Sequence, residues 1–447
     1  MFTLSSVSCC TAAPSDDIVD ISTSDIHELV VLSNGTVWAW GSNSYGQCSP
    51  DIHENNIDAN CPVMVAGLSD ITAVSARLCS TSLALKSDGT VWAWGSNTGG
   101  GLGRGIPTAY DASDDFWKPE PVPGLTNVIA IAASPQTALA LKDDGTVWAW
   151  GMNDRGQLGT EAIPMGDFSY ASSPVQVEGL SDVKAIATGC QNGFAVKNDG
   201  TVWAWGAGSS VLSSQHGYKV GVARTPVLVP GFTDVKSLSI GGSHALLLKN
   251  DGSVWAWGSD WRGALGINSS AYDTPDCYNT RTPVQVPGLA DVVAIDVSNG
   301  HSVALCGDGS VWSWGANYGG QIGDGSLEDV NRPWRVPVKD IVLISGSSMV
   351  DRDGNIYKCT KQGVSKLDFK FNTGQEQSQQ AINNTELKPV ASEQPAATVP
   401  VELAPSEQAT STPVSSTLPG GNSVLTIGVL LITVVAMGFI VYLAIRK

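Results

Sequence analysis

Basic residues are scarce in this 447-residue chain. Lysine and arginine together number 25, against 42 aspartate and glutamate residues, which gives a formal net charge of -17. Proteins bind nucleic acid largely by neutralising its phosphates with lysine and arginine. The sequence also has no basic N-terminal tail. We therefore exclude nucleic acid as a partner.

Motifs that hold metals or build catalytic centres are also missing. No C-x-x-C pair occurs among the nine cysteines, which argues against a zinc site. There is no phosphate-binding glycine loop, and no spacing typical of a Ser/His/Asp or Cys/His nucleophile. The stretch Asp351–Asn355 resembles half of a calcium loop, but it falls where the other repeats have an ordinary turn. We therefore expect no metal, no cofactor and no enzymatic activity.

The histidines and cysteines have structural interpretations. His27, His244 and His301 each stand seven residues before a turn of the repeat described below, which predicts a structural role. Most of the cysteines are expected to be small buried hydrophobic residues. Cys48 and Cys61 flank one loop of the first repeat and could form a disulfide in an oxidising compartment.

Repetition is what the chain has in abundance. The phrase Val-Trp-Ala-Trp-Gly recurs five times, and a sixth copy has serine in place of alanine. An Asn-Gly or Asp-Gly turn precedes each copy, which predicts a β-hairpin with a type I′ turn. Because side chains alternate across a strand, both tryptophans of a copy share one face, where we expect them to pack between neighbouring sheets. These structural tryptophans are Trp38, Trp40, Trp92, Trp94, Trp148, Trp150, Trp203, Trp205, Trp255, Trp257, Trp312 and Trp314.

Each repeat contains two more predicted strands. A Pro-Val segment follows the tryptophan strand and is typical of an outer strand, and an apolar strand such as Asp182–Ala187 comes next. Four strands per repeat form one blade of a β-propeller. The turns predict an all-β, seven-bladed propeller over residues 18–371, with Lys366–Phe371 as the strand that could complete the ring. Six blades plus a cap is the alternative, because the last repeat, at Asp353-Gly354, lacks both tryptophans.

The repeat resembles that of the regulator-of-chromosome-condensation family, which ends in Trp-Gly and then Asn-x-x-Gly-Gln-Leu-Gly. The third copy follows this pattern from Trp150 to Gly159, and the sixth follows it from His301 to Gly323. The resemblance spans Ile18 to Thr360 and implies a seven-bladed propeller. The founding member of the family is a nuclear guanine-nucleotide exchange factor that docks on chromatin. The acidic composition of this chain argues against chromatin, and no catalytic residue can be carried over.

The composition changes after the repeats. Residues 372–423 are rich in Gln, Ser, Thr, Ala, Pro and Glu, which predicts a disordered linker or stalk. Residues 424–445 carry no charge and are long enough for a transmembrane helix. The basic residues 446–447 favour a single-pass protein with a cytoplasmic C-terminus and an extracytoplasmic propeller. Leu418–Asn422 is similar to part of a Gram-positive cell-wall sorting signal, which favours a membrane-anchored, prokaryotic-type family member. Residues 1–17 resemble the remnant of an export signal.

The long connections from each Trp-Gly to the next Pro-Val leave the same strand end, so they share one face of the disc. They differ most between copies, and such loops commonly carry binding. Aromatic residues are enriched at interface hot spots. The candidate binding residues on these loops are Tyr45, Tyr110, Trp117, Tyr170, Tyr218, Trp261, Tyr272 and Tyr318.

These observations predict a surface-anchored propeller that presents its loops to a protein or glycan partner. Two alternatives stay open. One is an extracellular hydrolase or lyase that acts on a polymer and takes its acids from the variable loops. The other is a membrane-tethered regulator of a small GTPase, of the guanine-nucleotide exchange type.

Overall fold

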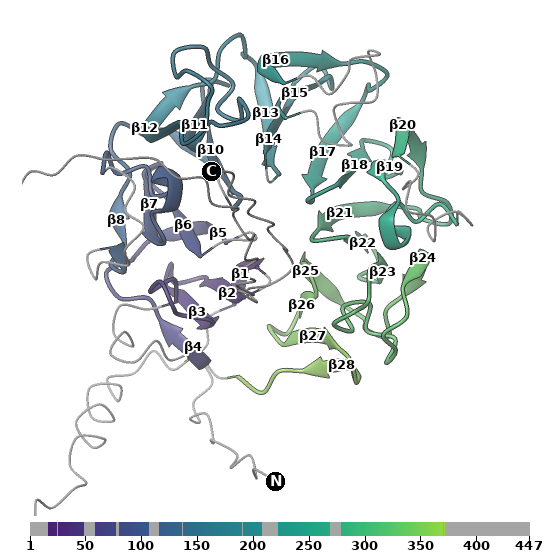
Figure 1. Ribbon diagram of the computed structural model, residues 1–447. Coiled ribbons are helices and arrows are strands. Elements are labelled where there is room, and N and C mark those ends of the chain that lie inside the picture. Colours follow the sequence, from purple (N-terminus) through teal and green to yellow (C-terminus); the bar gives the residue numbers. More distant parts are fainter. Residues whose placement is uncertain are drawn as a thin grey trace, which may run out of the picture. The chain divides into compact units, whose positions relative to one another are not determined.

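The computed structural model describes residues 17–24, 26–48, 59–76, 80–106, 116–135, 137–189, 191–207, 222–268, 279–369 and 371. All of them belong to one compact unit, Met1–Gln377. Their strands form seven four-stranded antiparallel sheets, arranged as blades around a central axis (Figure 1). The predicted seven-bladed propeller is confirmed. The alternative of six blades plus a cap is wrong, because the last repeat forms a complete sheet of its own.

The first four blades follow the chain in order. Blade 1 holds β1 (Ile18–Thr23), β2 (His27–Leu32), β3 (Val37–Gly41) and β4 (Ala59–Met64). Blade 2 holds β5 (Ile71–Ser75), β6 (Thr81–Lys86), β7 (Val91–Gly95) and β8 (Glu120–Pro121). Blade 3 holds β9 (Val128–Ala133), β10 (Thr137–Lys142), β11 (Val147–Met152) and β12 (Tyr170–Gln176). Blade 4 holds β13 (Val183–Thr188), β14 (Asn192–Lys197), β15 (Val202–Gly206) and β16 (Ala223–Val229).

The last three blades repeat this arrangement. Blade 5 holds β17 (Val235–Ile240), β18 (His244–Lys249), β19 (Val254–Ser259) and β20 (Asn279–Gln285). Blade 6 holds β21 (Val292–Val297), β22 (His301–Cys306), β23 (Val311–Gly315) and β24 (Val330–Arg335). Blade 7 holds β25 (Ile341–Ser345), β26 (Ser348–Asp351), β27 (Ile356–Thr360) and β28 (Gly363–Lys366). Short 3-10 helices, η2 (Thr98–Gly100) and η4 (Trp261–Gly263), lie in the loops of blades 2 and 5.

The hairpin turn between the second and third strands differs from the expected type. In blade 2, the amide of Gly89 donates to the carbonyl of Lys86, and the amide of Lys86 donates to the carbonyl of Thr90. Gly89 has a φ of 79°, whereas Asp88 is not among the residues with positive φ. A type I′ turn requires positive φ at both central residues, so that prediction is wrong. The turn is a three-residue loop in which the carboxylate of Asp88 accepts hydrogen bonds from the amide and hydroxyl of Thr90.

The second tryptophan of each phrase lies between neighbouring blades. Trp94, Trp150, Trp205, Trp257 and Trp314 are fully buried and share hydrophobic clusters with residues of the preceding blade. The first tryptophan of each phrase packs at the edge of the same clusters and is half-buried in blades 2 to 6. The large indoles therefore fill the wedge-shaped space between sheets, and they supply much of the buried apolar area.

The ring closes without strand exchange, because blades 1 and 7 are each built from consecutive strands. We expected Lys366–Phe371 to form the outer strand that completes the ring. That prediction is wrong, because the outer strand of blade 7 is β28, which ends at Lys366. The residues that follow β28 pack on blade 1 instead: the Phe369 ring lies 5.3 Å from Trp40 and the Phe371 ring 5.5 Å from Trp38. Closure thus depends on side-chain packing across the two ends of the propeller.

None of the helices in the described part of the chain combines the length and the hydropathy needed to cross a membrane. The predicted span at 424–445, the linker at 372–423 and residues 1–16 lie outside the described residues.

Candidate functional site

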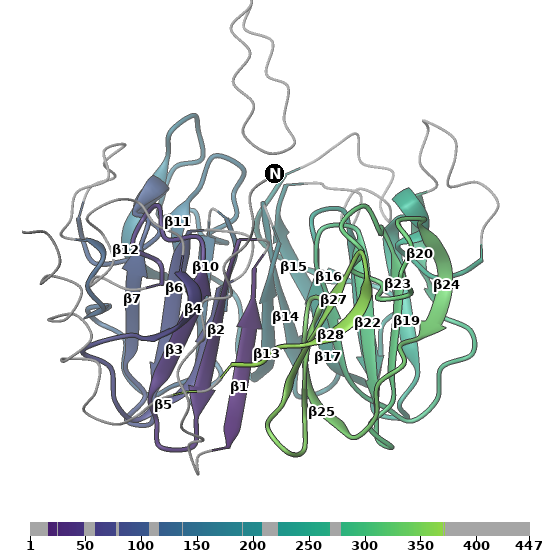
Figure 2. The ribbon, with the colours of Figure 1, turned by 90° about the horizontal axis from the view of Figure 1, so that it is seen from below.

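One face of the propeller carries the long connections between the third and fourth strands, together with the short connections between the first and second strands. We call it the loop face. The opposite face carries the Asp-Gly turns. The side view shows longer excursions on one edge of the disc, where the 3-10 helices lie, and tight turns on the other (Figure 2). Candidate binding residues in the long connections therefore share the loop face.

A repeated side-chain bond shapes the long connections of blades 1, 2, 3, 5 and 6. An asparagine or aspartate accepts a hydrogen bond from the amide five residues later, which folds the segment into a compact bend. The pairs are Asn43 with Cys48, Asn97 with Leu102, Asn153 with Leu158, Asp260 with Leu265 and Asn317 with Ile322. This bond uses the Asn of the Asn-x-x-Gly motif, so the motif is structural.

The same loops dock under the next blade. The indole of Trp94 donates to the carbonyl of Gln47 at 2.9 Å, and the indole of Trp150 donates to Gly101 at 2.9 Å. The indoles of Trp205 and Trp314 donate to the equivalent carbonyls of Gln157 and Ala264. The two residues between the Asn or Asp and the Gly of the motif take no part in these bonds, so their side chains are the ones that can contact a partner.

Two of the candidate aromatics are not display residues. Trp117 is only 6% exposed, and a Cβ on Gly46 would lie 2.2 Å from its ring, so it packs on the loop of blade 1. Tyr170 is half-buried, and its ring lies against Gly100 of blade 2. The expectation that these two side chains are exposed is wrong, because the glycine of each loop makes room for the start of the next blade's outer strand.

Three other candidates are exposed on the loop face. Tyr45 is 43% exposed, Trp261 39% and Tyr318 53%. Each stands between the Asn or Asp and the Gly of its loop motif. The remaining candidates, Tyr110, Tyr218 and Tyr272, lie outside the described residues.

The structure brings Trp261 and Tyr318 together through a residue that the sequence did not single out. The guanidinium of Arg262 lies 4.7 Å from the Trp261 ring centre and 5.9 Å from the Tyr318 ring centre. Both distances fall within the range of cation–π attraction. The half-buried guanidinium of Arg262 thus joins aromatic side chains from blades 5 and 6.

Asp329 fixes this group in place. Its carboxylate accepts a hydrogen bond from Arg262 at 2.8 Å and another from the amide of Asn317 at 2.9 Å. The backbone of Arg262 has a φ of 58°, at the position where η2 of blade 2 has Gly99. Such a conformation costs free energy in a residue other than glycine and persists only where the surroundings impose it. The loops of blades 5 and 6 therefore form one braced unit, here called the Arg262 cluster and comprising Trp261, Arg262, Tyr318 and Asp329.

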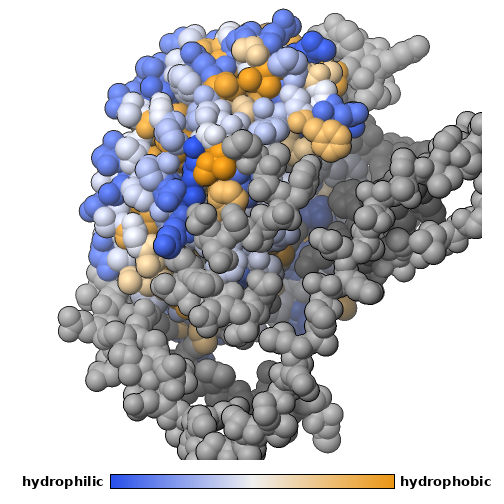
Figure 3. Space-filling model, turned by 60° about the vertical axis from the view of Figure 1, so that its left-hand side comes forward, coloured by the Kyte–Doolittle hydropathy of each residue, from blue (hydrophilic) through white to orange (hydrophobic). Residues whose placement is uncertain are grey.

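Outside this cluster, the apolar surface visible in Figure 3 is dispersed. On the face shown in Figure 3, hydrophobic residues form small patches among hydrophilic ones. Among the individually exposed residues on the loop face are Phe168, at 77%, and Leu327, at 53%. Recognition on this surface would depend on individual side chains.

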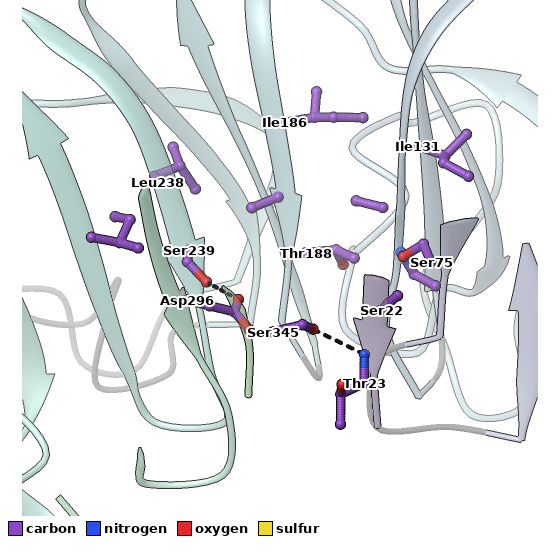
Figure 4. A pocket seen from close by; sticks show the side chains of 14 residues that line it. Ser22, Thr23, Ser75, Ile131, Ile186, Thr188, Leu238, Ser239, Asp296 and Ser345 are labelled. Atoms are coloured by element: carbon purple, nitrogen blue, oxygen red, sulfur yellow. Dashed lines mark hydrogen bonds between the residues drawn. The ribbon is translucent and has the colours of Figure 1, made fainter. Parts of the chain in front are cut away.

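A second feature of interest is a cavity of about 210 Å³ on the central axis, lined by the innermost strands of all seven blades. Its polar residues stand at or near the strand ends that face the loops, and its larger apolar residues come one or two positions earlier. Figure 4 shows Thr23 and Ser345 at one end of the cavity and Ile131 and Ile186 at the other. The polar lining comprises Ser22, Thr23, Ser75, Thr188, Ser239, Asp296 and Ser345.

Side chains around this cavity also link adjacent blades. Backbone amides of one inner strand donate to side-chain oxygens of its neighbour, as in Val74 to Asp20, Ala133 to Ser75 and Thr23 to Ser345. Burial raises the pKa of Asp20 to about 6, against the hydrogen bond from Val74, which lowers it. The inner rim is thus a ring of small polar groups.

The described histidines, His27, His244 and His301, lie inside the protein. His27 is 1% exposed, and its ring nitrogens contact Ser24 at 3.0 Å and Ser82 at 3.0 Å. Burial lowers the pKa of His27 from 6.5 to about 3. Burial also lowers the pKa of His301 to about 4, although Asp296 partly offsets the shift. Both rings are therefore neutral at physiological pH and are unsuited to proton transfer at the surface.

The proposed disulfide between Cys48 and Cys61 is wrong. Cys61 is disulfide-bonded, whereas Cys48 is a buried thiol that donates to the carbonyl of Ser42 at 3.2 Å. Cys48 also takes part in the loop bend, because its amide donates to the side chain of Asn43. In the described part of the chain, no group of three or more His, Cys, Asp or Glu residues could hold a metal ion.

Comparisons with a family model and with known proteins point to the same protein family. The RCC1-like domain matches residues 4–351. Protein pim1 of Schizosaccharomyces pombe is 28% identical over 352 residues, which are 72% of this chain and 64% of pim1. The chain thus spans less than two thirds of pim1. The ultraviolet-B receptor UVR8 of Arabidopsis thaliana is 27% identical over 343 residues, which are 73% of this chain and 72% of UVR8.

Solved structures show the same fold. Human WBSCR16 matches with a TM-score of 0.64 at 24% identity, covering 74% of this chain and 85% of that chain. Prp20p from Saccharomyces cerevisiae, described with its binding properties to Gsp1p and histones, matches with a TM-score of 0.62 at 21% identity. That match covers 83% of this chain and 86% of Prp20p.

Proposed function

The chain belongs to the RCC1-like domain family, and on that premise we propose that it is a binding module that holds a protein partner at the Arg262 cluster. The observation that carries the proposal is the pairing of two exposed aromatic rings with a braced guanidinium. Tryptophan, tyrosine and arginine are the residues most enriched among interface hot spots. A rigid arrangement also loses less conformational entropy on binding than a mobile one.

The bracing separates this cluster from the other exposed aromatic candidate. Tyr45 is as exposed as Trp261, yet no cationic side chain of the described residues lies over its ring. Tyr318 and Trp261 come from different blades and converge on Arg262, so a partner would contact two loops at once. We therefore place the partner over blades 5 and 6, and not over blade 1.

The proposed module is tethered at a cell surface. The uncharged stretch 424–445 would be the anchor, 372–423 the stalk, and the propeller would lie outside the cytoplasm. The sequence supports this proposal through the length of the uncharged stretch and the basic residues after it. A glycan partner is the alternative ligand for the same aromatic cluster.

Site-specific photo-crosslinking tests the binding role. A photoreactive phenylalanine analogue replaces Tyr318 in one version of the full chain and Tyr45 in another, and both are expressed in the native host. We expect a protein adduct from position 318 that Arg262→Ala reduces, and much less from position 45. Equal adducts from both positions, or adducts that do not depend on Arg262, would contradict the proposal.

A membrane-tethered regulator of a small GTPase is a second candidate, favoured by the structural likeness to Prp20p, whose described partners include Gsp1p. This function requires a propeller that faces the cytoplasm. Protease added to intact cells distinguishes the two placements. Complete cleavage of the propeller from outside eliminates the GTPase regulator, and complete protection contradicts the surface-anchored module.

A further inference from the structure

We infer that Phe168 anchors a second protein-binding surface on the loop face, by inserting its ring into an apolar pocket of a partner whose rim is basic. Phe168 belongs to the long connection of blade 3, which joins β11 to β12 at the loop-face edge of the disc (Figure 2). This surface is distinct from the Arg262 cluster and does not depend on it. Three observations support it: a strained backbone, an exposed ring and the charge of the surrounding segment.

The backbone of Phe168 has a conformation that a bulky residue rarely adopts. Its φ is 63°. Nine non-glycine residues in the described part of the chain have positive φ, and seven of them are aspartate or asparagine, which tolerate it. The other two are Phe168 and Arg262, and both lie on the loop face. Strain of this kind persists only where the surroundings impose it, and it is concentrated at binding and catalytic sites.

A tight turn imposes this conformation. The amide of Ser169 donates to the carbonyl of Gly166 at 3.0 Å, which makes Phe168 the third residue of a β-turn. Ser169 is itself fixed, because its carbonyl accepts the amide of Asn153 at 2.7 Å and its hydroxyl donates to the carbonyl of Pro164. A turn with positive φ at its third residue favours glycine or asparagine there. The phenylalanine therefore conflicts with local preference, as is expected of residues kept for function.

The ring gains little burial within its own chain in return. Phe168 is 77% exposed, the largest fraction among the exposed large hydrophobic residues that the structure describes. Ile163 of the same connection instead packs against the cluster that holds Trp205. The connection thus directs one apolar side chain inward and presents another to solvent. An aromatic ring presented in this way can bury a large apolar area against a partner, and aromatic residues are enriched at interface hot spots.

The charge of the segment indicates which partner fits. Glu161, Asp167 and Glu178 are exposed, and no lysine or arginine occurs from residue 156 to residue 180. Within the described residues none of these three carboxylates forms an ion pair. A hydrogen bond from Thr160 lowers the pKa of Glu178, which keeps it ionised at neutral pH. An anionic lipid surface would be repelled, whereas a protein pocket with lysine or arginine on its rim would be attracted.

Photo-crosslinking with a competitor tests this surface. The purified full chain carries benzoylphenylalanine at position 168, is mixed with an extract of the native host and is irradiated. We expect one protein adduct, with the crosslink in an apolar segment flanked by lysine or arginine when it is mapped by mass spectrometry. Wild-type chain without the photoreactive group, in about tenfold excess, should reduce the adduct about tenfold, because both chains compete for the same pocket.

Phe168→Asn is the decisive competitor, because asparagine adopts positive φ readily and lacks the ring. At the same excess it should leave the adduct undiminished. It should also raise the melting temperature by about 1–3 °C, since the backbone strain is relieved. A phenylalanine that stabilised its own fold would give the opposite shift. Leu327→Ala is the matched control, because Leu327 is 53% exposed on the same face and this variant should compete as well as the wild type.

The inference is overturned by the absence of an adduct, or by an adduct that Phe168→Asn reduces as much as the wild type does. An adduct to lipid, to a second copy of this chain or to a segment without basic residues overturns it as well, and so does a lower melting temperature for Phe168→Asn. The crosslinking test at Tyr318 gives a separate result, because it reports on blades 5 and 6. A failed crosslink there, with a competed adduct at position 168, would remove the Arg262 cluster and retain the surface at Phe168.

Discussion

Trp38 and Phe371 pack edge to face, with ring centres 5.5 Å apart and planes inclined at 64°. They come from the first and the last described parts of the propeller. The contact lies in a cluster that also holds Val350 and Ile356 of blade 7, so it joins the two ends of the ring. Near it, Glu28 of blade 1 accepts a hydrogen bond from Ser348 at 2.8 Å and forms an ion pair with Lys358.

This closure predicts that Phe371 is essential for stability although it lies outside every strand. Phe371 is 6% exposed, and Phe371→Ala should lower the free energy of unfolding by about 3 kcal/mol, because a buried ring is replaced by a cavity. Urea denaturation of the full chain measures the change. Phe168→Ala is the control, since Phe168 is 77% exposed and should change stability very little. Equal effects from the two substitutions would mean that the contact does not hold the ring together.

The blade count could be predicted from the sequence because its signals are local. An Asp-Gly turn, a tryptophan strand and a Pro-Val strand recur within each repeat, and the degenerate last repeat still carries Asp353-Gly354. Ring closure could not be predicted in the same way. It depends on contacts between distant ends of the chain, and the alternation in Lys366–Phe371 indicates burial without indicating which blade covers it.

Part of the candidate site could also be predicted from the sequence. Tyr45, Trp261 and Tyr318 fall between the Asn or Asp and the Gly of the loop motif, and those positions are displayed. Trp117 and Tyr170 lie beyond the motif and meet glycines of the preceding blade, a contact that no local pattern reveals. Arg262 and its partner Asp329 were missed, because they belong to different blades and only the fold brings them together.

The division between packing and display tryptophans gives a second prediction. Trp150 is fully buried and donates to the carbonyl of Gly101, so Trp150→Ala should lower the free energy of unfolding by about 3–5 kcal/mol. Trp261 is 39% exposed, and Trp261→Ala should leave stability nearly unchanged. The second substitution should instead reduce the photo-crosslinking yield from position 318. Thermal melts that rank the two substitutions in the opposite order would refute this division.

The buried histidines predict a loss of stability in mild acid. His27 and His301 have ordinary pKa values of 6.5 in the unfolded chain, and folding lowers them to about 3 and about 4. Below pH 6.5 these two histidines bind protons in the unfolded state but not in the folded state. Their full contribution to the free energy of unfolding is therefore present above pH 6.5 and is lost as the pH falls toward 4. Each ring contributes about 2 kcal/mol of this loss between pH 6.5 and 4.5.

Comparison of variants isolates this effect from the titration of carboxylates. His301→Gln keeps a side chain that can bond to Ser313, the hydroxyl 2.7 Å from the histidine ring, and removes the titrating group. The free energy of unfolding of this variant, measured in urea from pH 7 to pH 4.5, should fall less steeply than that of the wild type. Parallel pH profiles would show that His301 is protonated equally in both states.

Asp20 should have the opposite pH dependence. Burial raises its pKa from 3.8 to about 6, so the folded state favours the protonated carboxyl. Its contribution to stability is present below pH 3.8 and is lost as the pH rises through 6, because the charge is then held in a poorly solvated place. Asp20→Asn keeps an oxygen for the amide of Val74 and removes the charge. It should stabilise the protein by about 1–2 kcal/mol at pH 7.5 and by little at pH 4.

Asp88→Asn is the control, since hydrogen bonds from Thr90 lower the pKa of this exposed carboxyl and its substitution should give no gain at pH 7.5. A destabilised Asp20→Asn protein at pH 7.5 would mean that the charge on Asp20 strengthens the contact between blades 1 and 2.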